Sequence, residues 1–225
     1  MNFRVLKGLK ENREKFAYVK SCLMGKRVLV LDLETTGLLP SGDARTNFAN
    51  NNIYDNCRIV EISYYYTDSF GNDDQINIHN YLRKPDCDNF TIQEGAAEVH
   101  GIKIETLIEK GTSFHDILCA NLAKYICNAQ YIISHNTDFD IYVLLNELHR
   151  LNCIELIQAI MAKKRYYRIF CTCLMTRYTK LSKLYDEMFS KTPEIMHRAY
   201  GDVLSLLELI NGSIYTNYNI IGIKD

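Results

Sequence analysis

The spacing of apolar residues divides the first part of the chain into strands. Residues 27–33 (RVLVLDL) form a short, almost continuous apolar run, which is typical of a buried strand. Residues 58–66 and 75–83 have a similar character, and residues 70–74 (FGNDD) between them carry the Gly and Asn of a hairpin turn. These three strands are therefore expected to form an antiparallel meander.

The second half of the chain changes to helical spacing. Residues 138–151 place Ile141, Leu144, Leu145 and Leu148 on one helix face. The other elements that the pattern predicts are helices at 9–22, 117–127, 172–188 and 197–211, strands at 130–134 and 167–171, and a polar loop at 41–57. Alternating strands and helices favour parallel pairing, so we expect an α/β fold with a five-stranded mixed sheet flanked by helices.

Length and composition set the scale of this fold. The chain has 225 residues, of which 47% are hydrophobic and 24% charged, as in ordinary globular proteins. Only 3 prolines are present, which argues against long linkers. We expect a single domain over residues 1–225, with an N-terminal helical extension at 1–25 and a catalytic core at 26–211.

The 8 cysteines are expected to be reduced thiols. Charged residues within 7–15 interrupt any apolar leader, and no apolar run approaches the length of a membrane span. We therefore expect an intracellular protein of the cytoplasm or nucleus, without a membrane partner. The richness in Asn, Ile, Lys and Tyr is typical of AT-rich genomes, including viral ones. No cysteine pair has the common zinc spacing, which disfavours a cysteine-based metal-binding regulator.

Charge is distributed unevenly along the chain. The net charge is −1, so a nucleic-acid ligand would have to contact a local basic patch. Residues 161–200 hold nine Lys or Arg against three acids, a local balance of +6. The alternative is a solvated helix face without a ligand.

Two acids interrupt the first predicted strand. Asp32 and Glu34 alternate with Leu31 and Leu33, so their carboxylates lie on the same face. Like charges side by side on a buried strand disfavour each other's ionisation, and a divalent cation would relieve this cost. Hard oxygen ligands suit Mg²⁺ or Mn²⁺. Alternatively, the pair lies at the strand end and points into water.

A further acid follows the strand at 130–134. Asp140 lies in the first turn of the next helix, at a strand end, where sites form in open α/β sheets. The alternative is a first-turn acid that interacts with the helix dipole, which explains Asp138 better than Asp140.

His197 and Asp202 stand at the start of an apolar helix. They are five positions apart and do not share one ideal helix face, so with Gly201 nearby His197 is expected on a loop or distorted turn. Histidine can take a proton from water near neutral pH. A purely structural His–Asp pair is the alternative. Together, four carboxylates and one histidine are the groups that two-metal hydrolysis of a phosphodiester needs.

The motifs that contain these residues resemble those of the DEDDh branch of the DEDD 3′–5′ exonucleases. Residues 32–38 (DLETTGL), 135–140 (HNTDFD) and 197–202 (HRAYGD) are similar to the three family motifs in order and spacing. Residues 99–102 (VHGI) resemble the segment beside the terminal nucleotide. Cys171 stands where the family often has Asp, outside the catalytic set. The similarity spans residues 26–211.

The resemblance implies an RNase H-like fold and a role for each residue. Two divalent cations, Mg²⁺ or Mn²⁺, would be bound, one by Asp32, Glu34 and Asp202, with Asp32 bridging to a second near Asp140. His197 would be the general base. The positions expected to contact the terminal nucleotide are the main chain at Thr35 and Thr36 and the side chains of Leu38 and His100.

The expected function is metal-dependent 3′–5′ exonuclease activity that releases nucleoside monophosphates. The expected partners are a nucleic acid with a free 3′ end, preferably single-stranded, and a polymerase or other replication protein. No residue is identified that reads the 2′-OH, so DNA and RNA both stay open. The alternative is a catalytically idle nucleic-acid-binding or polymerase-accessory protein on the same fold. The 41–57 loop leaves the Asp32 strand and is expected to help retain substrate, although a loop without a role is equally compatible.

Overall fold

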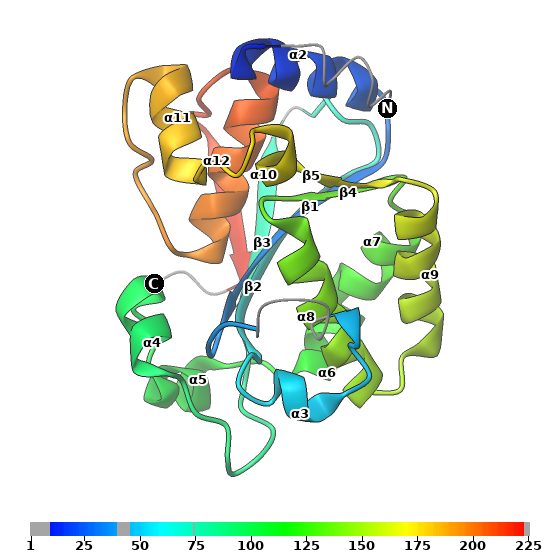
Figure 1. Ribbon diagram of the computed structural model, residues 1–225, viewed down its shortest axis with the longest axis vertical. Helices are drawn as coiled ribbons and strands as arrows, with labels where there is room; N and C mark the ends of the chain where they lie inside the picture. Colours follow the sequence, from blue (N-terminus) through cyan, green and yellow to red (C-terminus); the bar gives the residue numbers. More distant parts are fainter. Residues whose placement is uncertain (1–9, 40–45, 74, 223–225) are drawn as a thin grey trace.

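A mixed six-stranded sheet runs through the centre of the structure, a computed structural model that describes residues 10–39, 46–73 and 75–222 (Figure 1). The strands, in the spatial order β5-β4-β1-β2-β3-β6, are β1 (Val28–Thr35), β2 (Ile59–Thr67), β3 (Ile76–Leu82), β4 (Tyr131–Ser134), β5 (Ile169–Cys171) and β6 (Tyr218–Gly222). The pairs β1–β2 and β2–β3 are antiparallel, whereas β1–β4, β4–β5 and β3–β6 are parallel. The predicted mixed sheet is confirmed, with one strand more than expected.

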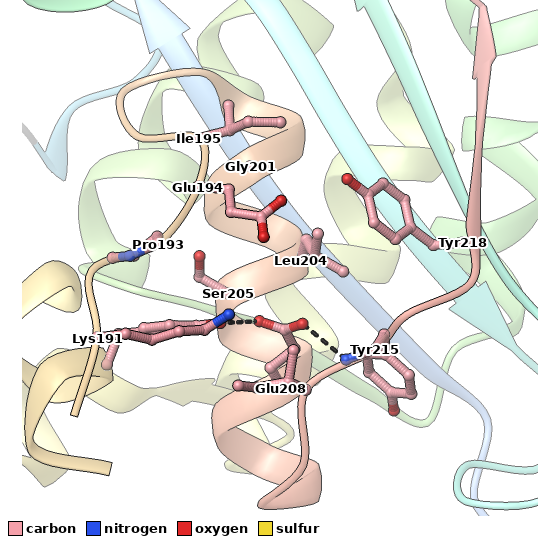
Figure 2. A pocket seen from close by; sticks show the side chains of 12 residues that line it. Lys191, Pro193, Glu194, Ile195, Gly201, Leu204, Ser205, Glu208, Tyr215 and Tyr218 are labelled. Atoms are coloured by element: carbon pink, nitrogen blue, oxygen red, sulfur yellow. Dashed lines mark hydrogen bonds between the residues drawn. The ribbon is translucent and has the colours of Figure 1, made fainter. Parts of the chain in front are cut away.

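The additional strand, β6, lies at the sheet edge beside β3, beyond the predicted 26–211 core. Its residues are partly or fully exposed, so the sequence there lacks the apolar alternation of a half-buried strand. The chain leading to β6 is held against α12 (Ala199–Asn211): Glu208, only 3% exposed, accepts hydrogen bonds from Tyr215 N at 2.8 Å and the Tyr185 hydroxyl at 2.6 Å (Figure 2).

Helices cover both faces of the sheet (Figure 1). Besides α12, the described helices are α2 (Asn12–Leu23), α3 (Asn51–Tyr54), α4 (Glu94–His100), α5 (Ile104–Lys110), α6 (Phe114–Ile117), the π-helical turn η2 (Leu118–Leu122), α7 (Ala123–Asn128), α8 (Thr137–Arg150), α9 (Ile154–Arg165), α10 (Thr172–Met175) and α11 (Leu181–Phe189). The single helix predicted at 172–188 was wrong. It is divided into α10 and α11, because Arg177 and Tyr178 adopt left-handed backbone angles, with φ of 58° and 61°.

The predicted loop at 41–57 is partly structured. Its residues 41–45 lie outside the described part of the chain, but residues 51–54 form α3. Asn146 on α8 donates to the carbonyl oxygen of Phe48 at 2.8 Å and to Asn51 Oδ1 at 3.0 Å, and Arg150 forms an ion pair with Asp55 at 2.7 Å. The end of this segment is therefore anchored on α8, and its role in retaining substrate stays a prediction.

The central strand β1 sends side chains to two separate clusters. Leu29, Leu31 and Leu33 pack against the helices of one face, including α8. Val28 and Val30 pack on the opposite face against α2 and α12. Successive side chains of a strand alternate, so the acids of β1 continue the face that α12 covers. The predicted N-terminal extension thus contributes α2 to the same core as α12.

A buried ion cluster joins α8 to β2 and β3. Glu147, 1% exposed, accepts hydrogen bonds from Arg58 Nε at 2.8 Å and from Arg83 Nη1 at 2.7 Å. Asp86, whose side chain is 47% exposed, contacts the same two guanidinium groups at 2.9 and 2.7 Å. Buried charges are stable only when paired in this way, so the cluster fixes the end of the sheet from which the β1 acids emerge.

No helix of the described residues is long and apolar enough to cross a membrane. All 8 cysteines lie within the described ranges, and none forms a disulfide, as predicted.

Candidate active site

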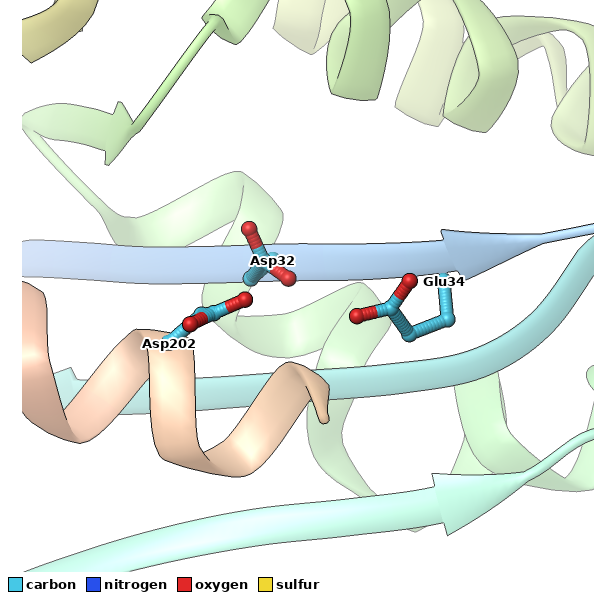
Figure 3. Close-up of side chains that lie close together, drawn as sticks. All are labelled: Asp32, Glu34 and Asp202. Carbon is cyan, nitrogen blue, oxygen red and sulfur yellow. The ribbon is translucent and has the colours of Figure 1, made fainter. Parts of the chain in front are cut away.

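Three carboxylates meet where β1 passes under α12. Oxygens of Asp32 and Glu34 on β1 and of Asp202 on α12 all lie within 4.8 Å of one another (Figure 3). The period of the strand places the first two on one face, and the first turn of α12 places the third against them. The structure therefore brings together three of the five predicted catalytic residues as potential ligands of one cation.

Asp140 approaches the same point from the start of α8, just beyond the end of β4. It is 3% exposed, and its Oδ2 is buried without a hydrogen-bond partner among the described residues. A buried carboxylate oxygen without a partner is costly, and a cation beside it would remove that cost. An all-oxygen donor set with an unpartnered buried oxygen fits a hard divalent cation.

Burial and mutual repulsion disfavour the charged forms of all four acids. Burial raises the pKa of Glu34 to about 8 and the pKa values of Asp140 and Asp202 to about 7. The pKa of Asp32 is raised well above its ordinary value, first by burial and then by the charge of Asp202. In the absence of a cation, protons would therefore compensate this cluster at neutral pH.

A fifth acid, Glu61, lies directly behind the cluster. It pairs in register with Glu34 across β1 and β2 and is 0% exposed. Its carboxylate accepts hydrogen bonds from Arg198 Nη2 at 2.7 Å and from the main-chain nitrogen of Ala199 at 2.9 Å. The motif search missed this residue, although a single acid within the apolar 58–66 run was a signal that it has a buried partner.

His197 lies just before α12, on an irregular turn, as predicted. Its side chain is exposed, and its backbone φ of 57° is left-handed, which is uncommon for a residue other than glycine. The turn also needs a glycine close by: a Cβ on Gly201 would lie 2.7 Å from the carbonyl oxygen of Ile195 (Figure 2). Glycine at this position therefore allows the segment before His197 to pack against the first turn of α12.

An open cleft connects His197 with Asp202. The residues that line it also include His135, Tyr178 and Lys180, and Tyr178 is 74% exposed. Lys180 belongs to the basic segment that the sequence singled out, whereas Tyr178 was not singled out, because its position depends on the unpredicted bend between α10 and α11.

His135 holds that bend against the end of β4. Its Nε2 donates to the carbonyl oxygen of Thr179 at 3.0 Å, and its Nδ1 lies 2.9 Å from Thr172 Oγ1. Burial lowers the pKa of His135, in keeping with a neutral ring. The second sequence motif thus positions the cleft wall through His135 as well as placing Asp140.

The basic segment 161–200 divides between internal and exposed side chains. Lys163 donates to the carbonyl oxygen of Cys127 at 3.2 Å, Lys164 pairs with Asp138, and Arg198 pairs with Glu61. The exposed basic residues of the segment are Arg165, Arg168, Arg177, Lys180 and Lys183. A phosphate-binding role for these residues stays a prediction, and Lys180 alone among them lines the cleft.

Of the residues expected near the terminal nucleotide, Thr35, Thr36 and Leu38 follow Glu34 in the chain, and His100 at the end of α4 is brought beside them. His100 is 5% exposed, and because its Nδ1 accepts from Ile102 N at 3.0 Å, its Nε2 carries the hydrogen that is donated to Thr35 O at 3.3 Å. The main-chain N–H and carbonyl of Thr36 are both hydrogen-bonded within the protein. His100 therefore supports the main chain of Thr35, whereas Leu38 is 81% exposed and available to a ligand.

The fold and the cluster together define a class: an RNase H-like α/β protein with a carboxylate site of the kind used in phosphodiester hydrolysis. The chain matches the exonuclease family RNase_T over residues 29–210 and belongs to that family. The predicted DEDD 3′–5′ exonuclease class and RNase H-like fold are confirmed.

The chain is similar to annotated DNA polymerase III epsilon subunits of Buchnera aphidicola. It is 32% identical over 126 residues to that of the subspecies Baizongia pistaciae, which covers 56% of this chain and 44% of the relative. It is 31% identical over 151 residues to that of the subspecies Acyrthosiphon pisum, which covers 67% of this chain and 52% of the relative. The chain thus spans about half the length of these relatives.

A solved structure has the same fold at low sequence identity. Pop2p of S. pombe, in a form with Mg²⁺ and Mn²⁺ bound, aligns with a TM-score of 0.55 and 13% identity, covering 91% of this chain and 92% of that chain.

The raised pKa values predict that metal-free protein is less stable at higher pH. In the unfolded chain these acids titrate near pH 4, whereas in the folded protein the pKa of Glu34 is about 8 and that of Asp202 about 7. Between about pH 5 and pH 8 the folded state binds more protons than the unfolded chain, so stability falls as pH rises. Melting temperatures in chelator should decrease over this range, and Mn²⁺ should raise them most at the upper end.

Asp202→Asn provides the comparison for this measurement, because it removes one titrating acid from the cluster. The decrease should be shallower in this variant than in the wild type. Equal slopes for the two proteins would show that the cluster does not titrate as described.

Asp138 and Asp140 form a matched pair for testing the second motif. Asp140 is buried beside the cluster, whereas the 46% exposed side chain of Asp138 pairs with Lys164 Nζ at 2.5 Å, a surface bridge worth about 0–1 kcal/mol. Asp140→Asn should reduce the rate of phosphodiester hydrolysis by orders of magnitude with an unchanged fold. Asp138→Asn should cost a little stability and retain most activity. The reverse result would place the catalytic acid at position 138.

Proposed function

We propose that this protein removes nucleotides from the 3′ end of a nucleic-acid strand by metal-dependent hydrolysis, releasing nucleoside monophosphates. The observation that carries the proposal is the group of Asp32, Glu34 and Asp202, whose oxygens lie within 4.8 Å of one another beside a cleft that His197 also lines. Membership of the exonuclease family supports the same reaction.

The carboxylates would hold two divalent cations, Mg²⁺ or Mn²⁺. Asp32, Glu34 and Asp202 are the ligands proposed for one cation, and Asp32 with Asp140 for the second. The unpartnered Oδ2 of Asp140 supports this assignment. When bound, the cations supply positive charge next to the scissile phosphate, where negative charge develops during hydrolysis.

His197 is proposed as the general base. Its exposed position on the cleft allows the ring to take a proton from the attacking water, whose oxygen forms the new bond to phosphorus. The bond from phosphorus to the 3′ oxygen of the preceding nucleotide breaks, and that oxygen gains a proton from solvent. The left-handed backbone at His197 supports a functional role, since strained residues cluster at active sites.

The terminal nucleotide is proposed to lie against the chain that follows Glu34. Leu38 offers an exposed apolar surface for the terminal base. The main chain at Thr35, which His100 supports, and at Thr36 is proposed to meet the same nucleotide. In the cleft that His197 and Asp202 line, Tyr178 offers an exposed ring for stacking a base and Lys180 a charge for a phosphate. These features favour a single strand whose bases are unpaired.

The similarity to DNA polymerase III epsilon subunits favours DNA as the substrate and a polymerase as the partner. The chain spans about half the length of those relatives, so DNA as the substrate and a polymerase as the partner are proposed from the similarity of that part alone. We also propose that residues 1–225 act as a single exonuclease domain, with residues 26–211 as its catalytic core and α2 of the N-terminal extension packed against that core. The 8 cysteines without disulfides support an intracellular location. The alternative, an idle nucleic-acid-binding protein, is disfavoured by the presence of all five residues proposed as catalytic.

Hydrolysis of end-labelled strands tests the proposal directly. Purified protein with Mn²⁺ should release labelled mononucleotides at once from 3′-labelled single strands, whereas 5′-labelled strands should shorten progressively. Chelator and Asp32→Asn should abolish the reaction, and circular strands should resist it. The same assay run with DNA strands and with RNA strands shows which of the two is the substrate. Release in excess chelator would reject the metal mechanism, and cutting of circles would indicate an endonuclease.

Replacing His197 tests the general base. His197→Ala should lower kcat by about 100-fold or more while leaving the melting temperature nearly unchanged, because the side chain is exposed. His115→Ala is a suitable control, since the side chain of His115 is 71% exposed and lies on α6, away from the cluster. If the two variants keep the same kcat, His197 is not the base.

A further inference from the structure

We infer that Glu61 is a positioning residue for this active site: through Arg198 and the start of α12 it fixes His197 and Asp202 relative to each other. The inference rests on the proposed function, because it concerns the geometry of that site. Glu61 is not among the five residues that the motifs assign, and it contacts other parts of the site rather than the substrate.

Both oxygens of Glu61 are fully engaged within the protein. Its Oε1 accepts from Arg198 Nη2 at 2.7 Å and from Asn80 Nδ2 at 3.1 Å. Its Oε2 accepts from Arg198 Nε at 3.1 Å and from Ala199 N at 2.9 Å. A bidentate pair with arginine is directional as well as strong, so it fixes the orientation of the guanidinium group. Because these four contacts engage both of its oxygens, Glu61 differs in role from the carboxylates whose oxygens cluster as potential metal ligands.

The contact with Ala199 supplies what α12 lacks. The N-cap residue, Arg198, makes no side-chain capping hydrogen bond, and the first N–H groups of a helix have no partner inside the helix. Glu61, on the strand β2, accepts a hydrogen bond from one of these groups, the N–H of Ala199. Its carboxylate also places negative charge at the positive end of the helix. A side chain on β2 thus caps the helix that carries Asp202.

Arg198 is held from both its side chain and its main chain. Glu61 holds the guanidinium group, while the carbonyl oxygen of Arg198 accepts from Gly201 N at 2.9 Å and Asp202 N at 3.0 Å. His197 precedes this residue with a left-handed φ of 57°, a conformation that persists only when neighbouring contacts impose it. The contacts that hold Arg198 therefore connect His197, which precedes it, to the first turn of α12, which follows it.

The charges of Glu61 and Arg198 explain why each of these two residues needs the other. Glu61 lies opposite Glu34 in the sheet, so an unpaired carboxylate there would add to the repulsion within the cluster. Arg198 pairs with Glu61 through two hydrogen bonds and offsets that charge. Removing Arg198 leaves the buried charge of Glu61 without an ionic partner, and removing Glu61 takes the paired carboxylate from a partly buried guanidinium group.

Glu61→Gln is the variant that tests the inference, because it keeps the size of the side chain and removes the charge. It should lower kcat by about 10- to 100-fold, the usual effect of losing a residue that orients a catalytic group, with KM little changed. The amide hydrogen of Ala199 should exchange faster with solvent. Arg198→Lys, which keeps the charge but loses the bidentate contact, should have the same two effects even if Glu61→Gln folds poorly.

Glu208→Gln is the matched control. Glu208 lies on α12, the helix that carries Asp202, and its side chain is buried like that of Glu61. Its carboxylate accepts hydrogen bonds from Tyr215 N (Figure 2) and from the Tyr185 hydroxyl. This variant should keep its kcat per folded molecule and the slow exchange of the Ala199 amide. The inference is overturned if Glu61→Gln retains a kcat within about twofold of the wild type, or if both variants lose the same kcat per folded molecule. If the wild type itself lacks nuclease activity, the proposed function fails, and Ala199 exchange still decides whether Glu61 holds the helix.

Discussion

Repulsion between closely spaced carboxylates that are partly or fully buried is the constraint around which this structure is arranged. Asp32, Glu34, Asp140 and Asp202 come from three different elements and meet at one point, although burial and mutual repulsion raise the pKa of each. The apolar contacts that the neighbouring side chains of β1, α8 and α12 make on the two faces of the sheet hold these elements together. The packing of the core therefore stabilises an arrangement that electrostatics alone would disperse.

Elsewhere in the described residues, deeply buried acids have partners. Glu147 is paired with two arginines, Glu61 with Arg198, and Glu208 accepts from a tyrosine hydroxyl and a main-chain nitrogen. Asp140 differs from them, because one of its oxygens is buried without a hydrogen-bond partner among the described residues. This contrast between Asp140 and the paired acids supports the proposed role of the carboxylate cluster.

The parts of the site that follow from short-range patterns could be predicted from the sequence. Strand alternation places Asp32 and Glu34 together, and the irregular turn at His197 follows from its spacing to Gly201 and Asp202. Local signals also identified the first three strands and the helix over 138–151, because β1 and β2 are buried on both faces and have almost continuous apolar runs, while α8 has apolar residues at helical spacing.

The features that sequence analysis missed depend on contacts between distant segments. Strand β6 is stabilised by pairing with β3 and by the path of the chain along α12, while its own residues are largely exposed. Glu61 meets Arg198 across 137 positions of sequence. The break between α10 and α11 follows from left-handed residues 177 and 178 and from the contact of His135 with Thr179, and local helix propensity gives no indication of either.

The ion cluster of Arg58, Arg83 and Glu147 has a consequence for how the chain folds. Arg58 and Glu147 are 89 positions apart, and neither can enter the interior alone without a large cost in desolvation. The sheet and α8 therefore cannot close onto each other gradually: the charges stay hydrated until both segments arrive together. Contacts so distant in sequence slow folding, so we expect the docking of α8 onto the sheet to be a cooperative step.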